Sequence, residues 1–147
     1  MAHMDKFISK LNELSFSEMY NNDFFLTWEK TRDELDAVFT VADALRCMRE
    51  NNISPKIFDS GLGISLFRDN STRTRFSFAS ACNLLGLEVQ DLDEGKSQVA
   101  HGETVRETAN MISFMADVIG IRDDMYIGKG NTYMHNVVDA VREGNKD

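Results

Sequence analysis

The feature that most constrains the fold is an alternation, in the second half of the chain, of short apolar runs with stretches of helical periodicity. Three strand-like runs are expected, at residues 64–67, 87–92 and 118–121. Helix-period stretches follow them, at 72–85, 105–115 and 131–142. This order predicts an α/β fold: a parallel sheet flanked by helices on both faces, in three α/β/α layers. Ligands of such sheets bind beyond the carboxyl ends of the strands.

The first half of the chain is expected to be helical. Apolar spacing predicts a short amphipathic helix within residues 5–20. A second helix should run from the capping-box pattern at Thr31 to Glu34 as far as about Asn51. Residues 1–4 resemble a tag remnant with a native start at Met4. The domain itself is expected to comprise residues 5–147, and the chain is expected to be incomplete after Asp147.

Composition excludes several classes of function. A net charge of -8 argues against nucleic-acid binding, which needs a basic face. No apolar run approaches the roughly 20 residues that span a bilayer, and the N-terminus has no signal-peptide pattern, so no membrane partner and a cytoplasmic location are expected. Cys47 and Cys82 are far apart and are expected to be small buried thiols. Trp28 and most phenylalanines are assigned to packing.

The segment Ser71 to Arg75, with the sequence Ser-Thr-Arg-Thr-Arg, is the strongest candidate for a functional site. It lies where a strand should end and a helix begin, so free backbone N–H groups and the helix dipole favour an anion there. The hydroxyl groups add donors, and Arg73 and Arg75 carry planar guanidinium forks suited to phosphate oxygens. The alternative is an ordinary helix cap followed by solvated arginines.

Other site types are not supported by the sequence. There is no Walker motif, and Gly61 and Gly63 precede a strand instead of following one, which excludes a dinucleotide fingerprint. Asp91, Asp93 and Glu94 lack an EF-hand spacing, so a solvated strand end is favoured over a metal loop. The chain has no His/Cys ligand cluster, and neither a metal nor an organic cofactor is expected.

Residues 71–75, followed by Phe76-Ser77-Phe78, resemble the phosphate-binding signature of the aspartate and ornithine carbamoyltransferases. Three further segments fall in this family's order and rough spacing: Phe25-Leu26-Thr27, then Ser97-Gln98 with Gly102-Glu103-Thr104, and Ile119-Gly120-Ile121-Arg122. The resemblance runs from about Phe24 to Arg142. It implies a domain that binds carbamoyl phosphate, whose carbamoyl group is transferred to the amine of an amino acid.

The resemblance also implies roles for individual residues. The phosphate would be held by Ser71, Thr72, Arg73 and Thr74. Arg73, Thr74 and Arg122 would act catalytically, the last two at the carbonyl oxygen, and Gln98 would come from the neighbouring subunit of a homotrimer. The alternative for the polar stretch from Asp93 to Gly102 is a surface loop on a monomer. The family's His-Pro-x-Gln segment has no counterpart, because Pro55 is the only proline, and the acceptor domain is expected to be absent.

Departures from the family pattern leave the function partly open. Asn70 stands where the family usually has proline, Arg68-Asp69 is unusual, and His101 replaces a lysine of the aspartate branch. His101 is expected to be either a weak phosphate ligand or a polar loop residue, and His135 a helix-surface residue. Residues 126–134 match neither well-known branch, which suggests a different acceptor. A non-catalytic phosphate-metabolite-binding module and a regulatory pseudoenzyme are the competing hypotheses.

Overall fold

The computed structural model describes residues 2–68, 71–93, 95 and 101–144. The chain divides into two compact units, residues 1–55 and residues 56–147. We describe each unit by itself. The expectation of one domain over residues 5–147 stays a prediction.

The N-terminal unit is a pair of packed helices, α1 (Ala2–Asn12) and α2 (Arg32–Glu50), with two 3-10 turns between them, η1 (Ser17–Met19) and η2 (Thr27–Glu29). The capping box of α2 is confirmed, since Thr31 and Glu34 exchange side-chain bonds with each other's backbone amides. The short helix expected within residues 5–20 is present, but it covers only the first part of that range. The helix ends at Asn12, and the Ser15 amide donates instead to Asp33 in the first turn of α2, 3.0 Å away.

The second unit contains a three-stranded parallel sheet, with β1 (Leu62–Phe67) between β2 (Glu88–Asp91) and β3 (Val118–Arg122). The predicted strands are confirmed, with β1 two residues longer at its start. In the ladder, Phe67 pairs with Arg122, so β1 and β3 end level with each other. Ser65 pairs with Asp91, the last residue of β2. The carboxyl ends of all three strands therefore lie at one edge of the sheet.

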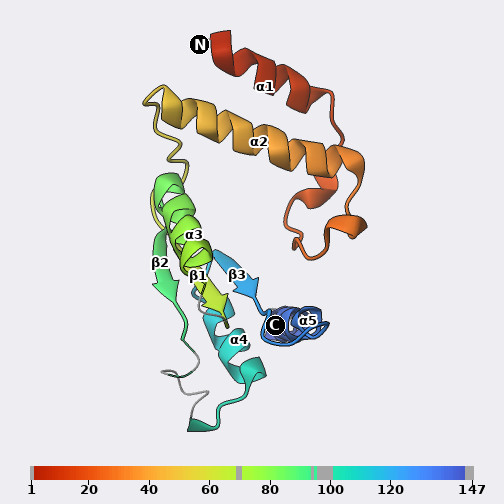
Figure 1. Ribbon diagram of the computed structural model, residues 1–147, viewed down its shortest axis with the longest axis vertical. Helices are drawn as coiled ribbons and strands as arrows, with labels where there is room; N and C mark the ends of the chain where they lie inside the picture. Colours follow the sequence, from red (N-terminus) through yellow and green to blue (C-terminus); the bar gives the residue numbers. More distant parts are fainter. Residues whose placement is uncertain (1, 69–70, 94, 96–100, 145–147) are drawn as a thin grey trace. The chain divides into compact units, whose positions relative to one another are not determined.

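Helices cover both faces of this sheet, as Figure 1 shows. Helix α3 (Thr72–Leu85) packs on one face, where the Phe67 and Phe78 rings meet edge to face with centroids 5.7 Å apart. Helices α4 (Val105–Ser113) and α5 (Gly130–Gly144) pack on the other. There β1 contributes Leu66 to a core completed by Ala109, Tyr133, Val137 and Ala140. Successive side chains of a strand point to opposite faces, which explains the split and confirms the three-layer α/β/α class.

The prediction that Trp28 and most phenylalanines are packed is wrong. The Trp28 side chain is 75% exposed, and six of the ten phenylalanines are exposed, among them Phe39 on α2. Helix α2 buries a different stripe, made of Glu34, Ala37 and Thr40. Cys82 is buried as predicted, whereas Cys47 is only half-buried.

Candidate anion-binding site at the start of α3

Helix α3 begins directly beyond the carboxyl end of β1, and its first turn is Thr72, Arg73 and Thr74, as predicted. Ser71 is the N-cap residue: its backbone is extended, and its hydroxyl accepts from the Thr74 amide at 3.4 Å. The start of α3 thus presents the positive end of the helix dipole at the sheet edge where ligands of such folds bind.

The first turn of α3 contains hydrogen-bond donors that have no acceptor among the described residues. Within the described part of the chain, nothing accepts a hydrogen bond from the amides of Thr72 and Arg73. This is the usual state of a helix start, whose first amides lack intrahelical partners. The Arg73 side chain is exposed and forms no hydrogen bond or ion pair with another described residue. Two amides and one guanidinium are therefore available to an anion.

Arg122 reaches the same place from the end of β3. Its Nη1 donates to Thr74 Oγ1 at 2.7 Å, and Thr74 Oγ1 lies 2.7 Å from Ser71 Oγ. The other terminal nitrogen donates to Asp124 Oδ2 at 2.6 Å. Three of the residues predicted from the sequence, separated by up to 51 positions, are thus joined in one hydrogen-bonded chain. The structure places hydroxyl and guanidinium donors side by side over the sheet edge.

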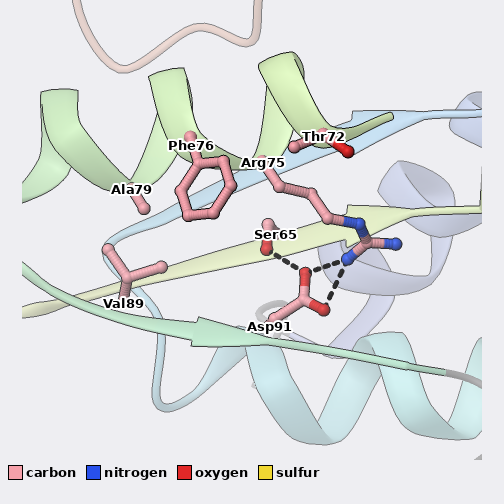
Figure 2. Close-up of a pocket in the computed structure, with 7 residues that line it drawn as sticks. All are labelled: Ser65, Thr72, Arg75, Phe76, Ala79, Val89 and Asp91. Atoms are coloured by element: carbon pink, nitrogen blue, oxygen red, sulfur yellow. Dashed lines mark hydrogen bonds and ion pairs between the residues drawn. The ribbon is translucent and has the colours of Figure 1, made fainter. Parts of the chain in front are cut away.

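Arg75 points away from this group of donors, contrary to the expectation from its planar fork. Its Nη2 donates to the Phe67 carbonyl at 2.6 Å, and its Nη1 pairs with the Asp91 carboxylate. Ser65 donates to the same carboxylate at 2.5 Å. Figure 2 shows this arrangement at one end of a pocket of about 490 Å³. The pocket is lined by Ser65, Thr72, Arg75, Phe76, Ala79, Val89 and Asp91.

A second ion pair, which the sequence analysis missed, ties the ends of β1 and β3 together. Arg68 donates to Asp123 Oδ2 at 3.0 Å, and the Asp123 side chain is only 4% exposed. The Arg68 guanidinium carbon also lies 4.2 Å from the centre of the Tyr133 ring of α5. One signal was available: Arg68 and Asp123 each follow a predicted strand, and parallel strands end at one sheet edge. The pair holds the segment that carries Arg122.

The pKa values of Cys82 and Glu107 are shifted, and the contacts that explain these shifts lie outside this group of donors. Burial raises the pKa of the Cys82 thiol, which keeps it protonated and unreactive, as expected for a small buried thiol. The pKa of Glu107 is lowered because its carboxylate accepts from the Thr104 amide and hydroxyl in the capping box of α4.

Several predicted residues take no part in the described site. Gln98 and Ser97 lie outside the described residues, so their predicted roles stay predictions. His101 and His135 are both exposed, the latter on α5 as expected.

Among the described residues, no three His, Cys, Asp or Glu side chains come together as a metal site would require. No helix in the described ranges is long and apolar enough to cross a membrane.

Residues 22–142 match the family described as "Aspartate/ornithine carbamoyltransferase, carbamoyl-P binding domain". The chain therefore belongs to the aspartate/ornithine carbamoyltransferase family, of which it carries the carbamoyl-phosphate-binding domain. It is 64% identical, over 99% of its length, to a protein of Escherichia coli (strain K12) named "Putative carbamoyltransferase YgeW". The chain spans 37% of the length of that relative.

Solved structures of the family share the fold. The catalytic subunit of M. jannaschii aspartate transcarbamoylase is similar with a TM-score of 0.65 and 26% identity, over 78% of this chain and 38% of that one. Aspartate transcarbamoylase from Trypanosoma cruzi, crystallised with carbamoyl phosphate and aspartate, gives a TM-score of 0.68 at 20% identity, over 78% and 34% of the two chains. This second likeness shows the fold alone.

Proposed function

We propose that this chain binds carbamoyl phosphate at the start of α3, with the phosphate held by Ser71, Thr72, Arg73 and Thr74. The observation that carries the proposal is the convergence of Arg122 on Thr74 over a helix start whose first two amides have no acceptor among the described residues. Backbone amides, hydroxyls and guanidinium groups are the donors that phosphate oxygens require. Arg73 is the cation best placed to meet the phosphate, because it belongs to the first turn and is exposed.

The same donors suit the chemistry of carbamoyl transfer. When an amine attacks the carbonyl carbon of carbamoyl phosphate, negative charge grows on the carbonyl oxygen and then on the departing phosphate. Donors already fixed in place stabilise this charge without reorganising. Thr74 and Arg122 are hydrogen-bonded to each other, so both donors would meet the carbonyl oxygen in a set geometry. Arg73 would stabilise the negative charge as it moves onto the leaving phosphate.

The wider parts of the proposal concern the protein that carries this domain. We infer that the acceptor is the amine of an amino acid, bound by residues beyond those of this chain. Gln98 would be supplied by the neighbouring subunit of a homotrimer in the cytoplasm. Support comes from family membership and from the order of the matching segments. Sedimentation velocity tests the assembly: a species of three times the 16.7 kDa chain supports it, and a monomer at all concentrations contradicts it.

Calorimetric titration with carbamoyl phosphate and with inorganic phosphate tests the binding site. Arg73→Gln should weaken both ligands by about tenfold to a hundredfold, because a charged hydrogen bond contributes about 1.5–3 kcal/mol. The matched control is Arg142→Gln, which removes the same charge from the last turn of α5. Arg142 lies about 18 Å along that helix from its start at the sheet edge. Equal affinities for the two variants would refute the assignment of Arg73.

A further inference from the structure

Arg75 joins three elements at the edge of the sheet where the strands end. It belongs to the second turn of α3, its Nη2 donates to the carbonyl of Phe67 at the end of β1, and its Nη1 pairs with Asp91 at the end of β2. Ser65, which is 3% exposed, donates its hydroxyl to the same carboxylate. Arg75 is half-buried and Asp91 is exposed, with 31% and 45% of their side chains accessible to solvent.

This arrangement gives Arg75 a different role from that of Arg73, although both belong to the segment from Ser71 to Arg75. The Arg73 guanidinium has no acceptor within the described chain, whereas two acceptors already hold the terminal nitrogens of Arg75. The Arg75 amide also closes the first turn of α3 by donating to the Ser71 carbonyl at 3.2 Å. The contacts of Arg75 thus fix the turn that carries the amides of Thr72 and Arg73.

We propose that Arg75, Asp91 and Ser65 form a positioning cluster for the phosphate-binding turn, and that Arg75 is not itself a phosphate ligand. The cluster anchors the start of α3 to the carboxyl ends of β1 and β2, so that the amides of Thr72 and Arg73 face one point. The inference rests on the proposed function, because it assigns Arg75 a role towards that site.

Removing the negative charge of Asp91 distinguishes a positioning role of Arg75 from direct phosphate binding by Arg75. If Arg75 contacted the phosphate directly, Asp91 would compete with the phosphate for it, and removing the Asp91 charge would tighten binding. If Arg75 positions the turn through Asp91, the same change weakens binding, although it removes a negative charge near an anion site. The two roles therefore predict opposite signs for Asp91→Asn, which keeps the shape of the side chain and leaves an oxygen for Ser65.

The experiment measures inorganic phosphate affinity of the 147-residue chain by NMR titration at constant ionic strength. Asp91→Asn should weaken phosphate binding about threefold to tenfold, since every phosphate donor is retained but is less well placed. Arg75→Lys should have a similar effect, and the double variant should lose no more than either single one. Glu88→Gln, at the other end of β2, removes the same charge from an exposed residue and should change little.

Binding that tightens in Asp91→Asn, or losses that add in the double variant, would overturn the inference. A separate readout in the absence of phosphate guards against a trivial loss of stability. Hydrogen exchange at the Thr74 and Arg75 amides should rise in Asp91→Asn, while exchange in the core of α5 stays unchanged. If the unmodified chain binds neither phosphate nor carbamoyl phosphate, the proposed function is refuted. Unchanged exchange at these two amides would sink the positioning cluster on its own.

Discussion

The Arg68–Asp123 ion pair offers a prediction that can be worked from the structure. Asp123 is 4% exposed and Arg68 is 28% exposed, so Arg68→Met leaves a carboxylate in a site that is almost dry. Breaking a buried pair by removing one partner costs about 3–5 kcal/mol. Arg68 is partly solvated, which reduces the expected loss to about 2–3 kcal/mol, including its contact with the Tyr133 ring. For a unit of this size, such a loss lowers the melting temperature by about 8–24 °C.

Thermal unfolding followed by circular dichroism measures this effect. The matched control is Arg106→Met, which breaks an ion pair with Glu143 whose partners are 70% and 44% exposed. Such surface pairs contribute about 0–1 kcal/mol, so this variant should melt within a few degrees of the parent chain. A double variant, Arg68→Met with Asp123→Leu, should recover part of the loss, because no charge is left unpaired. If Arg68→Met melts no lower than Arg106→Met, the buried pair does not hold the strand ends together.

Two further predictions concern titration. Burial raises the pKa of the Cys82 thiol, so the stability that this thiol contributes is present below the ordinary thiol pKa and is lost as the pH rises towards the raised pKa. Iodoacetamide should label the half-buried Cys47 before the buried Cys82, and equal labelling rates would contradict this. The pKa of Glu107 is lowered by bonds from Thr104, so its contribution is present above the ordinary Glu pKa and is lost as the pH falls through the lowered one. NMR titration should show Thr104→Ala raising this pKa part of the way towards its ordinary range, because the hydroxyl bond is lost while the backbone amide at position 104 still donates. No change would refute the contribution of the hydroxyl.

Local signals in the sequence predicted most of the second unit. The apolar runs located all three strands, and the helix-period stretch at 72–85 located α3, which ends at Gly86 in a left-handed conformation with φ of 102°. Arg122 was named from the family resemblance alone. The positions of Ser71 and Thr74 were also predictable, because a strand end and a helix start fix where their side chains begin. These features depend on periodicity and capping, which a single sequence contains.

The parts that failed depend on contacts distant in sequence. Whether Arg75 meets a phosphate or a carboxylate depends on the register of β2, which sets Asp91 opposite Ser65. Nothing in the local pattern fixes that register. The end of α1 was missed for a similar reason, since the bond from Ser15 to Asp33 spans 18 residues.

The most direct test of the central claim is the location of carbamoyl phosphate on the chain. Backbone amide shifts recorded during an NMR titration of the unmodified chain would give it. The largest shifts should fall on the amides of Thr72, Arg73 and Thr74, with a smaller one at Arg122. Saturable shifts confined to other segments, or none at these four residues, would contradict it.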